Sequence, residues 1–126
     1  MNEIDELEGA EMDEAVALAQ GWVKYLGVWI TETSSGRCWH EAVESYHPHR
    51  NIEQAWELVE AMMGDGYRLD PLRHSTLGFA VAYIARFIHE DGDGLPWEAG
   101  FIGQGYTAPT AICRAFLLVK AKEVEQ

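Results

Sequence analysis

The sequence predicts a single α+β domain in which an antiparallel sheet is layered with helices, an α/β/α sandwich. Three segments carry apolar residues at helical spacing, and runs of β-branched and aromatic residues lie between them. Layering helices on a sheet is the simplest way to bury three such apolar stripes. With 126 residues, 48% of them hydrophobic, the chain can build a core without disulfides or metal ions.

The charge of the chain is concentrated at its start. The net charge is −12, and seven acids fall within the first fourteen residues. We therefore expect residues 1–10 to form a flexible acidic arm and residues 11–126 to form the domain. So acidic a protein is unsuited to a nucleic-acid polymer or an anionic membrane. Because the acidic start differs from a signal peptide and the apolar runs are short, we expect a cytoplasmic protein.

The first half of the domain is expected to contain a helix and a hairpin. Apolar spacing predicts a helix over residues 12–26. Residues 28–33 and 37–42 are rich in β-formers and flank a Ser-Ser-Gly turn, which predicts a β-hairpin. The next segment, residues 46–50, is expected to be a loop because Pro48 disfavours helix in the residue before it.

A second helix is expected after Asn51, whose side chain suits an amino-terminal cap. Gly64 and Gly66 end this helix, and residues 67–70 follow as a short strand whose end is marked by Pro71. The residues expected on the buried side of the helix are Ile52, Ala55, Trp56, Val59 and Met63.

Residues 75–88 fit two structures. Apolar residues alternate strictly from Leu77 to Phe87, which favours a strand, but the segment also has apolar residues at helical spacing. The Asp-Gly-Asp-Gly turn at residues 91–94 and the β-like run over residues 97–102 indicate a hairpin. We therefore expect a strand, and a helix remains the alternative.

The clearest element is the last helix, together with the turn that leads into it. Gly103 and Gly105 allow the turn, and Thr107 is placed to cap the helix. Pro109 is tolerated only in a first helical turn, so it marks where the helix begins. The apolar residues of the expected buried face are Ile112, Ala115, Phe116 and Val119.

Three segments of the sequence, residues 17–22, 45–59 and 105–115, together resemble the phage ABA sandwich domain family. They contain a helix ending near a Gly-Trp pair, a Tyr-His-Pro turn before a helix with an Ala-Trp pair, and a closing Thr-Ala-Pro-Thr-Ala-Ile-Cys-Arg-Ala helix. The resemblance implies an α/β/α layered fold and a phage or prophage source. It implies no catalytic residue, because the family carries none that can be transferred to this chain.

The turn before the last helix is the leading candidate for a ligand site. Backbone N–H groups and the positive end of a helix dipole favour an anion such as a phosphate. An arginine can bind a phosphate and an aromatic ring can stack on a base. The alternative is a purely structural turn whose arginines pair with acids. The candidate ligand-binding residues are Gly105, Tyr106, Thr107, Thr110 and Arg114, joined by Arg68 and Arg86.

No motif points to catalysis or to a metal. The serines lack a nucleophile elbow, and no carboxylate pair stands in an apolar setting. His40, His47 and His49 follow Cys38 without the spacing of a zinc site, so we expect exposed loop histidines. Cys38 and Cys113 are expected to be core thiols. We therefore predict no catalytic residue, no metal and no cofactor.

The resemblance, combined with the candidate site, predicts a phage or prophage accessory protein of the host cytoplasm. By analogy with small non-catalytic phage proteins, we expect a homo-oligomeric counter-defence sponge that binds and sequesters a small cyclic-nucleotide immune signal. The first alternative is an acidic protein-interaction module, or in the extreme a DNA-mimic inhibitor of a host factor. A small nucleotide-acting enzyme is the second alternative.

Overall fold

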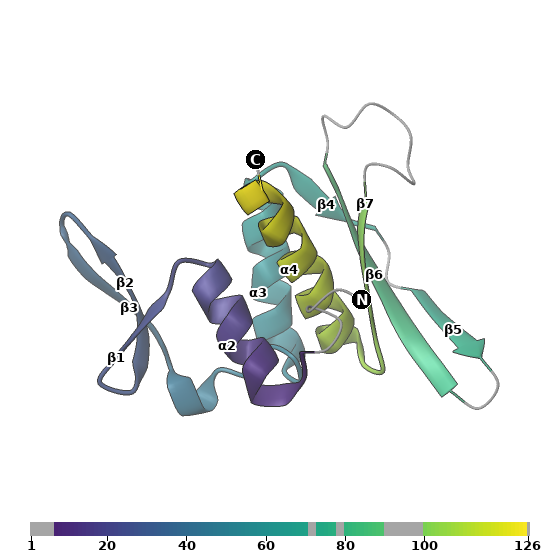
Figure 1. Cartoon of the computed structure of the whole chain (residues 1–126), viewed down its shortest axis with the longest axis horizontal. Helices are drawn as coiled ribbons and strands as arrows, with labels where there is room; N and C mark the ends of the chain where they lie inside the picture. Colours follow the sequence, from purple (N-terminus) through teal and green to yellow (C-terminus); the bar gives the residue numbers. More distant parts are fainter. Residues whose placement is uncertain (1–6, 71–72, 78–79, 90–99, 126) are drawn as a thin grey trace.

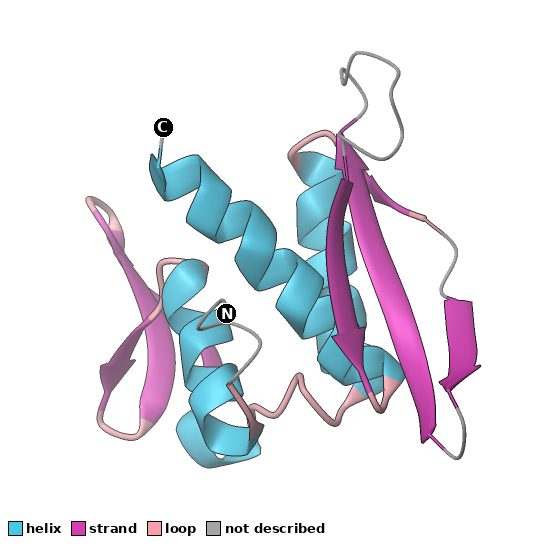
Figure 2. Ribbon diagram, turned by 45° about the vertical axis from the view of Figure 1, so that its right-hand side comes forward, coloured by secondary structure: helices cyan, strands magenta, loops and turns pink. Residues whose placement is uncertain are grey.

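Helices and antiparallel sheets are layered in this protein, and the helices lie between two sheets (Figures 1 and 2). The structure is a computed structural model and describes residues 7–70, 73–77, 80–89 and 100–125. The helices are α2 (Gly9–Ala19), the 3₁₀ turn Val43–Ser45, α3 (Ile52–Gly64) and α4 (Ala108–Glu125). The strands are β1 (Val23–Tyr25), β2 (Val28–Thr33), β3 (Gly36–Ala42), β4 (Tyr67–Leu69), β5 (Arg73–Leu77), β6 (Ala80–His89) and β7 (Gly100–Gly105).

The predicted α+β class is confirmed, although the sequence did not indicate that the strands divide into two sheets. Strands β1, β2 and β3 form one sheet in that order, and β4, β5, β6 and β7 form the other. None of the helices within the described ranges is long and apolar enough to cross a membrane. The predicted turn at residues 91–94 and most of the predicted acidic arm lie outside the described residues.

The first sheet corrects the prediction of one long helix over residues 12–26. Helix α2 ends at Ala19, and Gly21 adopts a left-handed backbone conformation with a φ of 84°. Residues Val23–Tyr25 instead pair with β2 as strand β1. The turn between them uses Leu26 and Gly27, both at positive φ. The predicted hairpin of β2 and β3 is confirmed.

Strand β6 is the centre of the second sheet. The described residues between 75 and 88 form strands rather than a helix, as expected, but the single strand predicted there is wrong, because residues up to Leu77 belong to β5 and pair antiparallel with β6. Strands β4 and β5 lie along one edge of β6, and β7 pairs with its other edge. Ala85 and Phe87 are fully buried and belong to the core beneath the helices. Because neighbouring side chains of a strand point to opposite faces, Arg86 lies on the face turned away from the helices.

Helix α4 packs closely against β7 at Gly103. A Cβ atom on Gly103 would come within 2.3 Å of both the Ala111 carbonyl oxygen and the Ala115 backbone nitrogen. Only glycine permits this approach. The predicted buried face of α4 is confirmed, since Ile112, Ala115, Phe116 and Val119 are all buried.

Helix α3 is oriented differently from the expectation. Asn51 caps it as predicted, accepting hydrogen bonds from the backbone N–H groups of Glu53 and Gln54 at 3.0 and 3.2 Å. Its buried residues are Ala55, Leu58, Val59 and Met62. Three residues that were expected to be buried are instead exposed, namely Ile52 at 48%, Trp56 at 45% and Met63 at 60%. The apolar arc of α3 is therefore wider than the core that it contacts.

Candidate functional site

The start of α4 gathers most of the predicted ligand-binding residues. Tyr106 is 79% exposed beside the helix end. The Thr107 hydroxyl accepts a hydrogen bond from the Thr110 backbone N–H at 3.4 Å and donates one to the Thr110 hydroxyl oxygen at 3.1 Å. Gly105 is buried against Thr110, where a Cβ atom would meet the threonine Cγ2 at 2.6 Å. Thr107 therefore caps α4 as predicted, and Gly105 serves close packing.

Arg114 follows one turn later and fastens α4 to two other segments. Its Nη1 donates to the Gln104 carbonyl oxygen at 2.7 Å, and its Nη2 donates to the Leu7 carbonyl oxygen at 3.2 Å. Its Nε is buried and has no hydrogen-bond partner among the described residues. Arg114 therefore holds α4 to β7 and to the segment before α2, and its buried Nε–H is left without an acceptor among the described residues.

Arg68 and Arg86 lie away from this end of α4. Both arginines form ion pairs with Asp70: Arg86 Nη2 is 2.9 Å from Asp70 Oδ2, and Arg68 Nη1 is 3.8 Å from Asp70 Oδ1. Leu69 packs against the core, so its strand neighbour Arg68 shares with Arg86 the sheet face turned away from the helices. The sheet thus separates Arg68 and Arg86 from the start of α4 within one copy of the chain.

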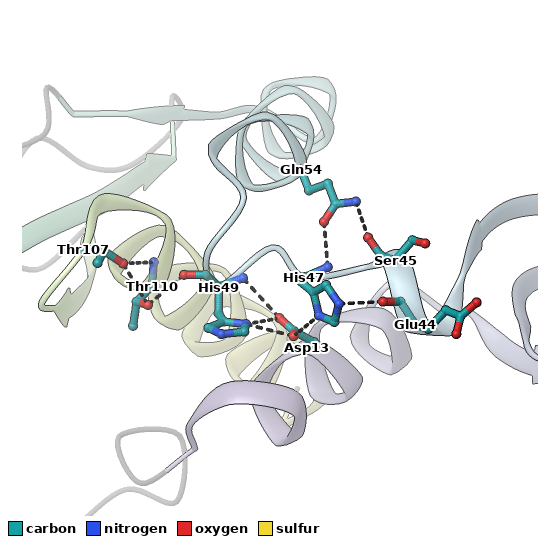
Figure 3. Close-up of polar contacts among 8 residues, drawn as sticks. All are labelled: Asp13, Glu44, Ser45, His47, His49, Gln54, Thr107 and Thr110. Carbon is teal, nitrogen blue, oxygen red and sulfur yellow. Dashed lines mark hydrogen bonds and ion pairs between the residues drawn. The ribbon is translucent and has the colours of Figure 1, made fainter.

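The start of α4 is joined to a polar network that centres on Asp13 of α2 (Figure 3). Asp13 is only 5% exposed. Its Oδ1 accepts a hydrogen bond from the His49 backbone N–H at 3.1 Å, and His49 Nδ1 lies 2.7 and 2.8 Å from the two carboxylate oxygens. His47 Nδ1 lies 3.2 Å from Oδ2. The Thr110 hydroxyl completes the connection by donating to the His49 carbonyl oxygen at 2.9 Å.

The loop that carries both histidines is held from its other side by Gln54 of α3. Gln54 Oε1 accepts from the His47 backbone N–H at 2.6 Å, and Gln54 Nε2 donates to the Ser45 carbonyl oxygen at 2.9 Å. His47 Nε2 lies 2.6 Å from the Glu44 carbonyl oxygen. The loop is thereby tied to α2, α3 and α4, and the expectation of exposed loop histidines is wrong for His47 and His49.

Sequence reasoning missed Asp13 because it was counted among the acids of the amino-terminal stretch. The available signal was its position beside Met12 and three residues before Val16, both on the buried side of α2. A buried carboxylate requires hydrogen-bond donors, and the histidine loop supplies them. Asp13 and the two rings satisfy one another and nearby backbone groups, which makes this cluster a clamp between elements.

Within the ranges that the structure covers, no group of three or more His, Cys, Asp or Glu side chains is arranged to hold a metal ion. Burial raises the pKa of the Cys113 thiol, which keeps it protonated and unreactive. Burial likewise raises the pKa of the Tyr46 hydroxyl, which accepts a hydrogen bond from Gln20 Nε2 at 2.8 Å. Cys38 is exposed, so its expected place in the core is wrong.

A second surface lies on the β2–β3 hairpin, which projects from the helices (Figure 1). Trp39 is 59% exposed, and its ring centroid is 6.0 Å from that of Tyr25. The Arg37 guanidinium lies 4.0 Å from the centroid of the Tyr25 ring. A shallow hollow of about 500 Å³ adjoins these side chains and is lined by Glu32, Thr33, Gly36, Arg37 and Trp39.

Together, the layered fold and the clamped polar loop define a small α+β domain built on one central helix. The model of the phage ABA sandwich domain matches residues 15–117 of the chain, which include both sheets, α3, the end of α2 and the first part of α4. The chain therefore belongs to the phage ABA sandwich domain family and is a phage protein. Comparisons with curated proteins and with solved structures gave no match.

Proposed function

We propose that this phage protein is a non-catalytic accessory protein that binds a small nucleotide at the start of α4 and sequesters it. In the infected host it acts as a sponge for a cyclic-nucleotide immune signal. The observation that carries the proposal is Tyr106, an aromatic ring 79% exposed beside a helix amino terminus. An exposed aromatic ring can stack on a base, and a helix amino terminus favours a phosphate.

The other groups at this end have defined roles in the proposal. Thr107 borders the phosphate while its hydroxyl caps Thr110, and the backbone N–H of Ala108 faces the phosphate, because Pro109 has no N–H and the Thr110 N–H donates to Thr107. Arg114 contributes the donors that it does not use on Gln104 and Leu7. Arg68 and Arg86 lie beyond the sheet, so they contact the ligand only from a second copy of the chain. The sponge is accordingly a homo-oligomer.

The proposal is tested by depletion and release. The protein is mixed with cyclic dinucleotides, cyclic trinucleotides and cyclic ADP-ribose isomers, filtered, and the filtrate is analysed before and after heat denaturation. Loss followed by intact return is the expected result. Loss followed by an altered product indicates an enzyme, and no loss with any compound in the panel refutes the proposal.

Two matched variants locate the binding site. Tyr106→Ala removes the stacking ring and is expected to weaken binding by about fivefold to 150-fold, corresponding to about 1–3 kcal/mol. Trp39→Ala removes another exposed aromatic side chain, 59% exposed against 79% for Tyr106, from the β2–β3 hairpin and is expected to leave binding unchanged. Equal weakening by both variants, or by Trp39→Ala alone, places the ligand elsewhere.

A second function is favoured by a different observation, the charge of the exposed surface. We propose as the alternative an acidic module that docks on a basic host protein, of which a DNA mimic is the extreme form. Helix α3 contributes three glutamates and no basic residue to this surface. Binding to a basic partner is then expected to weaken steeply with added salt, since exposed charges are screened. Binding that is insensitive to salt contradicts this function.

A further inference from the structure

Helix α3 exposes an apolar stripe that the core leaves uncovered. The stripe consists of Ile52, Trp56 and Met63, which are 48%, 45% and 60% exposed. Trp56 is four positions after Ile52, and Met63 is seven positions after Trp56, so the three side chains lie along one side of the helix. The buried residues of α3 lie on the adjoining face, which is turned toward the other helices and the second sheet.

The stripe has an acidic border. Glu53, Glu57 and Glu60 are exposed, and each lies one residue after, or one turn after, a member of the stripe. No lysine or arginine occurs in α3. Trp56 is the type of residue that dominates binding energy when it is buried at an interface. The surface therefore combines an apolar line, an aromatic anchor and charge of one sign.

We infer that the α3 stripe is a docking site for a basic amphipathic helix of a partner protein. A helix whose apolar residues recur every three or four positions presents a matching line to Ile52, Trp56 and Met63. Lysines or arginines beside that line face the three glutamates across the interface. The inference rests on the second proposed function and gives that function a site and a partner class.

Charge decides between a basic partner and a second copy of this chain. Two copies meeting through α3 would bring six glutamates to one interface without a basic residue from either helix. Repulsion between these glutamates disfavours self-pairing through α3 and favours a basic segment.

The test uses a fluorescent synthetic peptide of leucine and lysine, patterned so that its leucines form one face of a helix. A scrambled peptide of the same composition serves as the matched probe. Fluorescence anisotropy measures the dissociation constant with the full chain and with a double variant, Trp56→Ala and Met63→Ala. Leu18→Ala on α2, which removes a side chain that is 54% exposed, is the control.

The patterned peptide is expected to bind at least about tenfold more tightly than the scrambled one. The double variant is expected to lose about tenfold or more in affinity, whereas Leu18→Ala keeps the affinity of the full chain. Equal binding of both peptides, or unchanged binding by a folded double variant, overturns the inference. If that unchanged binding remains salt-sensitive, the acidic docking function survives on another surface.

A measurement of self-association tests whether the stripe binds a second copy of the chain instead. Sedimentation velocity of the full chain and of the double variant is compared at the same concentration. An oligomer that the double variant dissolves assigns the stripe to a second copy, which also overturns the inference. Circular dichroism and thermal unfolding of each variant confirm that the fold is retained.

Discussion

The contact between β7 and α4 leaves no room for a side chain at Gly103. In Gly103→Ala the new Cβ atom would stand 2.3 Å from two backbone atoms of α4 and 3.0 Å from a third. Ordinary contact of a Cβ begins at 3.4 Å, so strand and helix must separate by about 1 Å. Backbone atoms in a helix cannot rotate away, so the whole contact has to shift.

The size of the effect follows from this displacement. Overpacking in a well-packed core destabilises by about 1–3 kcal/mol, and a radial gap of about 1 Å removes up to about half of each dispersion contact. Because the obstruction is backbone, we expect the upper end, about 3 kcal/mol. Domains are stable by about 5–15 kcal/mol, so this loss is a large fraction of the total.

Urea denaturation followed by tryptophan fluorescence measures this free energy of unfolding. The control is Gly64→Ala at the end of α3, where a new Cβ meets no atom within 4 Å. This control is expected to be neutral or stabilising by up to about 1 kcal/mol, because alanine has the higher helix propensity. A Gly103→Ala protein within about 0.5 kcal/mol of the unaltered chain refutes the reasoning.

Three further outcomes are expected. Asp13→Ala leaves the half-buried His47 and His49 without their shared acceptor and lowers the free energy of unfolding by about 2 kcal/mol, whereas Glu14→Ala on the exposed side of α2 changes it by less than about 0.5 kcal/mol. Equal urea midpoints of the two variants would contradict the role of Asp13 in holding the loop. A thiol reagent labels the exposed Cys38 but not the buried Cys113 in the folded protein, and labelling of both cysteines before unfolding, detected by mass spectrometry, would contradict the burial of Cys113. Because burial raises the pKa of the Cys113 thiol, the free energy of unfolding falls as the pH rises above about 8.5, where only the unfolded thiol ionises. Asn51→Ala removes the cap of α3 and lowers the thermal midpoint by an amount corresponding to about 1 kcal/mol, and an unchanged midpoint would show that the cap is dispensable.

Local sequence signals were sufficient where one segment determines its own structure. The α4 prediction rested on a threonine cap, a first-turn proline and an apolar face, and all three are present. The β2–β3 hairpin was signalled by β-formers around a Ser-Ser-Gly turn. In these cases propensity, periodicity and turn chemistry agree, so tertiary contacts have nothing to override.

Local signals failed where two structures fit the same residues. Val23 and Leu26 continue the apolar spacing of α2, yet Val23–Tyr25 form β1 and Leu26 lies in the turn after it, because Gly21 ends the helix and β2 offers a pairing partner. In α3 the apolar arc is wider than any single contact, and only the packing of neighbouring elements decides that Leu58 is buried and Trp56 exposed.

The sequence by itself determined the α+β class, the family, and the last helix with its threonine cap and first-turn proline. These properties depend on neighbours within a few positions or on a pattern shared along the chain. Gly103 and Gly105, which were expected to allow a turn, instead lie in β7. Only the tertiary structure decided that Asp13 contacts His47 and His49 and that Arg114 donates two hydrogen bonds to carbonyl oxygens. It also decided that the sheet separates Arg86 from the start of α4. Partners in these contacts are far apart in sequence, so only the folded chain selects them.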